Sequence, residues 1–282
     1  MKRFKNLSLK SKISWILVCV FIAIWVIITV YPFIFMVLNS FKGQFEILAN
    51  GVFSLPQSFN LDNFKEVFNN GILHYFFNSI LVCAVSLVIT LLVAALAAYP
   101  IARLHSKIGK FFLLLVLACM SIPEHITLIP IFKFSTSAGL YDSLPALIGP
   151  DIAFALPISI FILVGFMEEL PKELEEAGEI DGCSRAGNFF HIVLPLTRPG
   201  MATLAIYNGV GIWNEFIFSY TLTQNKMNRT LPLAIWDFQG AHSMNAPMIM
   251  AVLTITTIPM LILFAVFQEK LMDSMTIGAV KG

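Results

Sequence analysis

Few residues of this 282-residue chain are of types that can do chemistry, and Glu215 stands out because it lies inside an apolar stretch. A carboxylate in such a stretch is costly to bury and usually faces a cavity or a partner. The neighbouring Trp213 has a ring able to stack on the face of a sugar, and Asn214 adds an amide. We therefore expect a polar passage here. The alternative is a structural carboxylate that is hydrogen-bonded to neighbouring helices.

Two further polar residues fall at expected helix ends, where interrupted helices leave backbone groups that need water or protein partners. Asn78 stands at the head of the second apolar stretch, and Glu124 follows Pro123 in the third. The candidate translocation path consists of Asn78, Glu124, Trp213, Asn214 and Glu215.

The chain lacks the residue groupings of an enzyme or a metal site. Its five histidines are scattered over different loops, and its four cysteines show no metal-binding spacing, so we expect reduced thiols. The pair Gly109-Lys110 lacks the upstream glycine of a phosphate-binding loop. We expect no catalytic residue, no metal and no ATP-hydrolysing machinery in this chain.

The composition is that of an integral membrane protein, with 57% hydrophobic and 12% charged residues and a mean hydropathy of +0.81. A membrane-spanning helix needs about 20 mostly apolar residues. Six windows meet this requirement, namely 15–38, 75–98, 111–132, 144–167, 201–222 and 247–267. We predict an all-α, polytopic membrane protein with six transmembrane helices.

The positive charges predict how the chain is oriented. An even number of spans puts both termini on one side, and that side carries thirteen of the 18 Lys and Arg residues. The positive-inside rule then places the N- and C-termini and the polar segment 168–200 in the cytoplasm. The apolar run 13–38 is too long for the core of a signal peptide, so we read it as a retained span.

Segment 168–200, which we call the elbow, interrupts the apolar pattern after the fourth window. Acidic residues at its start and Gly182 as a natural stop predict a short helix over 172–181. Ser184 can cap a second helix, which Pro195 should close because a proline disfavours helical backbone before it. The elbow is therefore expected to contain two short helices with a hinge between them.

The two expected helices have different faces. The first places Leu174, Ala177 and Gly178 together at three- and four-residue spacing, and these residues make a small, flat surface. The second carries bulky apolar residues such as Phe189 and Phe190. A small face beside a bulky one suits a protruding helix that enters a partner's groove while its neighbour anchors it. An ordinary solvated helical loop is the alternative.

The elbow pattern runs Glu176-Ala177-Gly178, then Gly182, then Ile192-x-Leu194-Pro195. This spacing resembles the EAA loop of permease subunits in binding-protein-dependent ABC importers, from which Gly178 departs by replacing an alanine. The resemblance to the maltose-transporter-type carbohydrate group extends to Asn78-Ser79, Ala98-Tyr99, Ala102-Arg103, Trp213-Asn214-Glu215-Phe216 and the C-terminal residues from Gly278 to Gly282.

The resemblance implies the type I ABC importer transmembrane fold and contact with an ATPase through the elbow. Glu176 would pair with a basic group of the ATPase, and Asp181 would brace the hinge. The expected ATPase-coupling residues are Glu173, Glu176, Ala177, Gly178, Asp181, Gly182, Leu194 and Pro195.

The resemblance also implies a set of partners. These are a second homologous permease in a heterodimer, two ATPase subunits that use ATP and Mg²⁺, an extracytoplasmic solute-binding protein, a sugar and membrane lipid. We expect no nucleic acid and no cofactor bound by this chain. The expected location is the bacterial inner membrane.

The expected organisation has four parts. They are a cytoplasmic tail (1–12), a first span with an outer segment (13–71), the importer core including the elbow (72–268) and a cytoplasmic tail (269–282). Two other functions are open: a permease for another solute class, and an ion-coupled secondary transporter. The latter would normally carry coupling acids near the middle of the membrane, where Glu215 is the one candidate.

Overall fold

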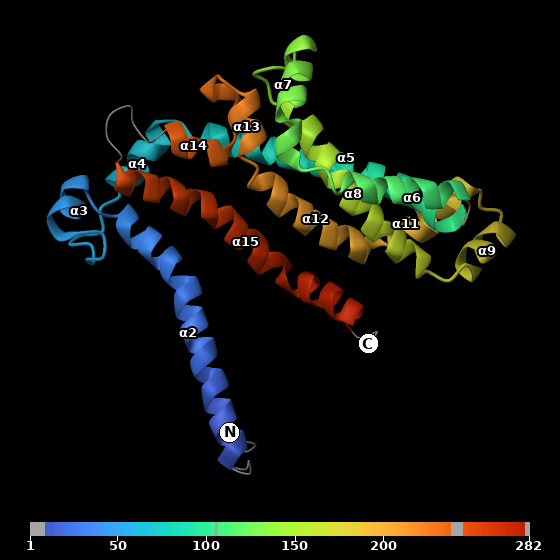
Figure 1. The fold of residues 1–282 in the computed structure, drawn as a ribbon, viewed down its shortest axis with the longest axis horizontal. Helices are drawn as coiled ribbons and strands as arrows, with labels where there is room; N and C mark the ends of the chain where they lie inside the picture. Colours follow the sequence, from blue (N-terminus) through green and yellow to red (C-terminus); the bar gives the residue numbers. More distant parts are fainter. Residues whose placement is uncertain (1–8, 105–106, 238–244, 280–282) are drawn as a thin grey trace. The chain divides into compact units, whose positions relative to one another are not determined.

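A computed structural model describes residues 9–104, 107–237 and 245–279, drawn as a ribbon in Figure 1. In these ranges all regular structure is helical and no strand occurs, which confirms the all-α prediction. The described residues form two units, one within Met1–Asn70 and Phe238–Thr257, the other within Gly71–Asp237 and Ile258–Gly282. We describe each unit by itself.

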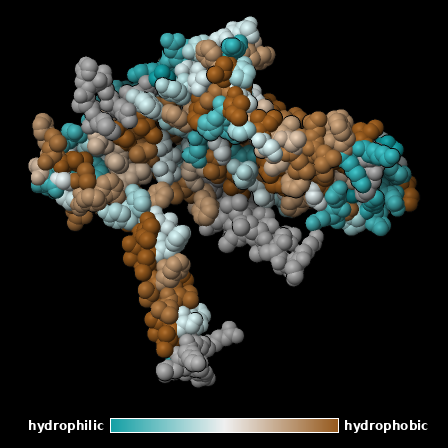
Figure 2. Space-filling model, viewed as in Figure 1, coloured by the Kyte–Doolittle hydropathy of each residue, from teal (hydrophilic) through white to brown (hydrophobic). Residues whose placement is uncertain are grey.

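The first unit contains α2 (Leu9–Ser40), α3 (Gln44–Asn50) and α4 (Asp62–Asn69). Residues 13–34 of α2 are all exposed, and Figure 2 shows the hydrophobic surface on the visible face of this helix. A long helix that is apolar all round is typical of a membrane span, because lipid can cover every face.

A buried lysine organises the segment between α2 and α4. Lys42 has no exposed surface, and its ammonium group donates to the Val52 carbonyl and the Ser54 hydroxyl, each at 3.2 Å. The Asn63 amide donates to the Lys42 carbonyl at 2.8 Å. These bonds replace the water that the ammonium loses on burial.

The second unit is built on α5 (Ile72–Leu104) and α8 (Pro145–Glu168), which pack along each other. Small residues make this close approach possible, because Ala94, Ala98 and Ala102 are fully buried in one core cluster with Leu163 and Met167. Small side chains let helix backbones approach closely, which favours packing between helices in a membrane.

Shorter helices complete the second unit. They are α6 (Lys107–Cys119), η1 (Glu124–Thr127), α7 (Leu128–Ser137), α9 (Glu173–Ile180), α10 (Arg185–Asn188), η2 (Phe189–Val193), α11 (Leu194–Leu196), α12 (Arg198–Trp213), α13 (Ile217–Leu222), η3 (Lys226–Asn228) and α14 (Leu231–Asp237). The long helix α15 (Ala246–Ala279) begins in the first unit and ends in the second.

Two of the expected spans are not continuous helices. The third breaks after α6, and the chain resumes at Glu124 with a bend of 87°. Pro123 accounts for this break, because proline lacks an N–H and disfavours helical backbone in the residue before it. The fifth window, 201–222, is interrupted between α12 and α13, at Asn214 to Phe216. The break in the third window lies at Pro123 and Glu124, where the sequence predicted an interrupted helix, whereas the break in the fifth was not predicted.

Three helices of the described chain are long and apolar enough to cross a membrane: Lys12–Ser40, Ile72–Arg103 and Pro145–Glu168. The number rises to five if each of two bent helix pairs counts as one span. A shorter apolar helix covers Ala246–Ile262. The chain is thus a multi-pass membrane protein, and the count of six spans stays a prediction.

An aspartate ties together two loops of the second unit. Asp142 has a positive φ of 58°, which Asp tolerates better than most residues. Its carboxylate accepts the backbone N–H groups of Gln224 at 2.8 Å and Asn225 at 2.9 Å. Burial raises the pKa of the Asp142 carboxyl, but these hydrogen bonds, with Asn228 and Arg229 nearby, lower the pKa overall.

Candidate functional site

The first helix of the elbow, α9, ends as its sequence predicts. Gly182 adopts a left-handed φ of 87°, which glycine reaches without steric cost. Its N–H bonds the Glu179 carbonyl at 3.1 Å, and the Cys183 N–H bonds the Gly178 carbonyl at 2.8 Å. This pair of bonds is the Schellman motif, which satisfies carbonyls at a helix end and turns the chain sharply.

The second half of the elbow begins at the expected cap but continues further than predicted. The Ser184 hydroxyl accepts the Gly187 N–H at 3.2 Å, so α10 starts there. The helix then widens into the π-helix η2 and runs through Pro195 to Leu196. The expected stop at Pro195 was wrong. A wide π turn directly before a proline relieves the clash between the proline ring and the preceding turn.

Gly178 faces the second half of the elbow and not a partner. It is buried, and a Cβ built on it would lie 2.5 Å from Asn188 Oδ1 and 2.6 Å from Ile192 Cδ1. The Asn188 amide donates to the Glu175 carbonyl at 3.0 Å, and Asn188 is 1% exposed. The expectation that Gly178 belongs to a docking face is therefore corrected, since its small size serves the joint between the two halves.

One exposed face of α9 carries Glu173, Glu176, Ala177 and Ile180, and Leu174 and Glu179 are exposed beside it. Ile180 is 87% exposed, an unusual position for an isoleucine at the tip of a polar segment. Hydrophilic residues gather around this end of the molecule in Figure 2. Asp181 is exposed, and the described residues offer its side chain no hydrogen bond, so the brace expected from Asp181 is supplied by Asn188 instead.

The elbow is anchored in the helix bundle by apolar residues of η2. Phe189 and Val193 are 4% and 1% exposed and belong to the core cluster of α5 and α8. The Phe189 ring lies 5.1 Å from the Tyr99 ring of α5, measured between centroids. Leu194 packs against the same cluster. The bulky half of the elbow is thus embedded, as predicted, while α9 projects from it.

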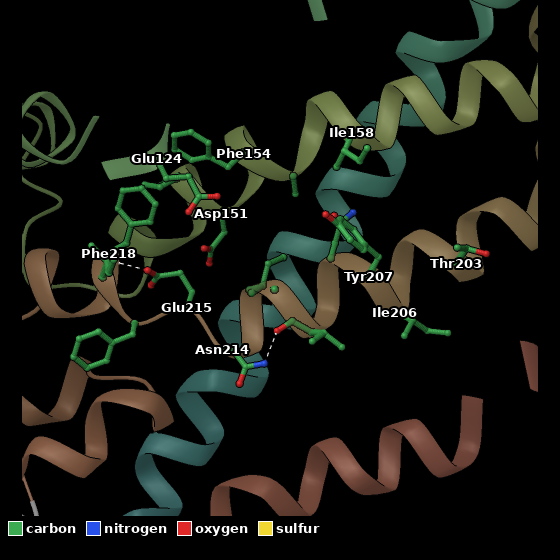
Figure 3. A pocket seen from close by; sticks show the side chains of 18 residues that line it. Glu124, Asp151, Phe154, Ile158, Thr203, Ile206, Tyr207, Asn214, Glu215 and Phe218 are labelled. Atoms are coloured by element: carbon green, nitrogen blue, oxygen red, sulfur yellow. Dashed lines mark hydrogen bonds between the residues drawn. The ribbon is translucent and has the colours of Figure 1, made fainter. Parts of the chain in front are cut away.

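Glu215 lies where the helix is interrupted between α12 and α13. Its carboxylate accepts the backbone N–H of Phe218 at 2.6 Å and that of Ser219 at 3.0 Å, and Figure 3 shows the first of these bonds. The interruption leaves N–H groups at the start of α13 without helical partners, and the carboxylate satisfies two of them. Glu215 therefore has the structural role that the sequence left open as an alternative.

Glu215 also lines a cavity of about 1000 Å³ in the second unit. Glu124 from η1 and Asp151 from α8 line it too, and Figure 3 shows the three carboxylates at the same end. Asp151 is 7% exposed, and within the described part of the chain its carboxylate accepts no hydrogen bond. Asp151 was missed in the sequence, although the rule that selected Glu215 applies equally to an acid inside the fourth apolar window.

The remaining wall of the cavity is largely apolar and aromatic. Its other residues include Phe154, Ile158, Tyr207, Asn208, Asn214, Phe216 and Phe218. Apolar walls with few, well-placed polar groups are typical of cavities that hold small molecules. Among the described residues, no group of three or more His, Cys, Asp or Glu is arranged to hold a metal ion.

The structure brings together only part of the candidate path. Glu124, Asn214 and Glu215 line the cavity, whereas Asn78 and Trp213 are not among the lining residues. The Asn78 amide donates to the carbonyls of Met227 and Arg229, each at 2.9 Å, which fastens the loop around η3 to the head of α5. The Trp213 ring packs edge-on against Phe76 at 5.9 Å.

Comparison with known proteins agrees with this geometry. Residues 90–276 match the family described as binding-protein-dependent transport system inner membrane component. The chain is 43% identical over 263 residues to the ABC transporter permease protein ORF2 of a Caldicellulosiruptor species, covering 93% of this chain and 96% of the relative.

Two further relatives carry more specific names. The arabinooligosaccharides transport system permease protein AraQ of Halalkalibacterium halodurans is 34% identical, with 96% of this chain and 97% of the relative covered. The trehalose/maltose transport system permease protein MalG of Thermococcus litoralis is 33% identical, with 91% and 93% covered.

A solved structure shares the fold. A chain of a bacterial ABC transporter involved in the import of the acidic polysaccharide alginate superposes with a TM-score of 0.81 at 19% identity, covering 93% of this chain and 98% of that one. The fold, the elbow and the family match agree. This chain belongs to the family of inner-membrane permease components of binding-protein-dependent ABC importers.

Proposed function

We propose that this permease moves a sugar or oligosaccharide into a bacterial cell, driven by a separate ATPase that docks on the elbow. The observation that carries the proposal is the exposed face of α9, where Ile180 is 87% exposed while Gly178 on the opposite face is buried. Such a face is held in a fixed shape by its joint and needs a partner to cover it. The named relatives, whose names refer to arabinooligosaccharides and to trehalose/maltose, support a carbohydrate as the solute.

The ATPase should present a basic groove with an apolar floor. Glu173 and Glu176 would pair with basic side chains of that groove, and Ile180 would enter its floor. Ala177 leaves room for the close approach. ATP and Mg²⁺ would be bound and used by the ATPase, and this chain would supply no part of the hydrolytic site.

A second permease would close the cavity. The lining residues of α12 include Tyr207 and Val210, which are 63% and 38% exposed although they belong to a cavity wall. A homologous permease facing this wall would complete a passage wide enough for a sugar, in a heterodimer. Sugar hydroxyls would donate to the carboxylates of Glu124 and Asp151, and aromatic rings such as Phe216 would contact the sugar faces.

The direction of transport follows from the charge distribution. The excess of positive residues on one side supports a cytoplasmic location for both termini and the elbow, where ATP would be available. An extracytoplasmic solute-binding protein would deliver the sugar from the other side. Closure of the two ATPases would push the elbow and rock the helices between two states, one open to each side of the membrane.

Reconstitution tests the proposal directly. The permease pair, the ATPase and the binding protein are placed in liposomes, and uptake of radiolabelled arabino-, malto- and chito-oligosaccharides is measured with and without ATP. We expect saturable, ATP-dependent uptake of at least one sugar, and no uptake when any component is omitted. Uptake that proceeds without the ATPase but requires an ion gradient would overturn the proposal in favour of a secondary transporter.

A point variant separates docking from folding. Glu176→Gln should reduce co-purification of the ATPase and sugar uptake together, since the exposed carboxylate loses its charge but the helix is retained. Gly187→Ala is the matched control, because a Cβ there would meet its nearest neighbours only at ordinary contact distances of 3.5 Å. If Glu176→Gln leaves both measurements unchanged, Glu176 is not a docking residue.

A further inference from the structure

One acid of α9 points away from the exposed face. Glu175 is 15% exposed at its side chain, whereas Glu173, Glu176 and Glu179 of the same helix are exposed. Its carboxylate is engaged on both oxygens. Oε1 pairs with Nε of Arg103 at 2.5 Å, and Oε2 accepts the Tyr99 hydroxyl at 2.7 Å.

Both partners of Glu175 come from the last turns of α5. Tyr99 and Arg103 are four residues apart, so they lie on the same face of that helix, one turn above the other. Arg103 is 11% exposed, and its Nη1 also donates to the Leu170 carbonyl at 3.2 Å, directly before the elbow turns into α9. We call Tyr99, Arg103 and Glu175 the α5–α9 clasp.

The clasp joins α9 to the helix bundle between the two ends of α9. Within the elbow α9 lies between the turn after α8 and the hinge at Gly182. Asn188 holds the far side of α9 through the Glu175 carbonyl at 3.0 Å. Glu175 is therefore gripped by its side chain from α5 and by its backbone from α10, and α9 is fixed to both.

Glu175 makes an ion pair with Arg103 and a charge-assisted hydrogen bond with Tyr99, and such contacts suit a link that must hold two helices in place. They are shorter, stronger and more directional than neutral hydrogen bonds, so small displacements of either helix are opposed. Removing one member of a buried pair leaves the other as an uncompensated charge, so the pair resists partial opening. An apolar contact would instead allow α9 to slide along α5.

We infer that the α5–α9 clasp passes movement of α9 to α5, and that Glu175 is a positioning residue for coupling and not a contact to the ATPase. The inference rests on the proposed function of the elbow. It also gives a role to Tyr99 and Arg103, which lie at the foot of the second apolar window and were not assigned to any site from the sequence. The small exposed area of Glu175 and the engagement of both its oxygens leave little of it for a partner.

The test uses the reconstituted importer and two measurements, sugar uptake per ATP hydrolysed and the amount of ATPase that co-purifies. Glu175→Gln keeps the shape of the side chain but loses its charge. We expect uptake per ATP to fall about tenfold, within the range of coupling factors measured between protein sites, while ATPase co-purification stays at the wild-type level. Glu179→Gln, on the exposed part of the same helix, is the matched control and should change neither measurement.

A charge swap distinguishes a mechanical link from a general need for stability. Arg103→Glu alone should uncouple the importer strongly, and adding Glu175→Arg should restore much of the uptake per ATP. Melting temperatures in detergent are measured for all variants. Recovery of the melting temperature without recovery of uptake per ATP would overturn the clasp as a coupling device.

Two outcomes separate the clasp from the function on which it rests. If the wild-type assembly retains the ATPase and couples uptake to ATP, but Glu175→Gln couples equally well, only the clasp is refuted. If Glu175→Gln releases the ATPase, Glu175 is a docking residue and the inference is wrong. If the wild-type chain neither binds an ATPase nor moves a sugar with ATP, the proposed function itself fails.

Discussion

The elbow and the cavity use acidic residues in opposite ways. In the elbow, Glu175 has partners for both carboxylate oxygens, from α5, and Asn188 holds its backbone carbonyl. In the cavity, Asp151 is buried beside Glu124 and Glu215 and receives no hydrogen bond from the described chain. The two regions thus differ in how fully their buried acids are paired within the described chain.

This difference indicates that the cavity is less stabilised than the elbow. A buried carboxylate without a donor costs free energy, and residues at binding sites often carry such costs. Glu215 lies between the two cases, since it satisfies two N–H groups of α13 and also lines the cavity. Variants that change side-chain volume, backbone strain or charge in each region can therefore test this difference.

The largest effect is expected from Gly178→Val. The first carbon of the new side chain would lie 2.5 Å from Asn188 Oδ1, and a β-branched group cannot turn away from both Asn188 and Ile192. Overpacking of this kind costs about 1–3 kcal/mol. ATP-dependent uptake should fall to background while membrane insertion is retained. Normal uptake would mean that the two halves of the elbow do not need their close joint.

A second, smaller effect is expected from Gly182→Ala. The space around Gly182 is open, so the only penalty is the left-handed backbone, which costs an L-residue about 1–2 kcal/mol. Uptake should be reduced but measurable, and Gly182→Asn should be milder because Asn tolerates this conformation. Equal uptake by the wild type, Gly182→Ala and Gly182→Asn would show that transport does not depend on a residue that adopts the left-handed conformation easily.

The cavity half of the comparison is tested by a pair of neutral variants, Glu215→Gln and Asp151→Asn. Hydrogen bonds to charged groups contribute about 1.5–3 kcal/mol and neutral ones about 1 kcal/mol, so Glu215→Gln should lower the melting temperature in detergent. Asp151→Asn should leave the melting temperature unchanged or raise it, because no hydrogen bond is lost. Destabilisation by Asp151→Asn would mean that Asp151 is a structural acid like Glu215.

The smallest effect is expected at Asp142, which lies outside the spans. Its carboxylate accepts backbone N–H groups, so it serves as a reference for a fully hydrogen-bonded acid. Its pKa is lowered in the folded protein, so the stability it contributes is present above the ordinary aspartate pKa, about 4. This contribution is lost as the pH falls from there through the folded-state pKa. Asp142→Asn, which tolerates the positive φ, should flatten the melting temperature over that acidic range. An unchanged pH profile would contradict the assignment.

The elbow could be predicted largely because its helix ends obey local rules. Gly182 as a stop and Ser184 as a cap each act within a few residues, and both were expected from the sequence. The burial of Gly178 against the second half of the elbow could not be expected, because it depends on the angle between α9 and α10. The π turn before Pro195 was likewise not predicted, and its residues Phe189 and Val193 are buried in the core.

The cavity could be predicted only in part, because its acids come from three distant segments. Glu124 and Glu215 were selected as polar residues in apolar stretches, and Asp151 was available to the same reasoning. The break at Asn214 has no proline or glycine to mark it. The one local sign was an Asn-Glu pair whose side chains bond the backbone: the Asn214 amide donates to the Val210 carbonyl, and the Glu215 carboxylate accepts N–H groups of α13.

The uncovered isoleucine at the tip of α9 has a consequence for the protein before it is assembled. Ile180 is 87% exposed, so under the proposed docking every newly made copy would present this apolar side chain to water until an ATPase bound. Exposed apolar groups of this kind attract chaperones and proteases, which remove unpaired subunits. The cellular amount of this permease should therefore follow the supply of its companion ATPase, and surplus copies should be degraded.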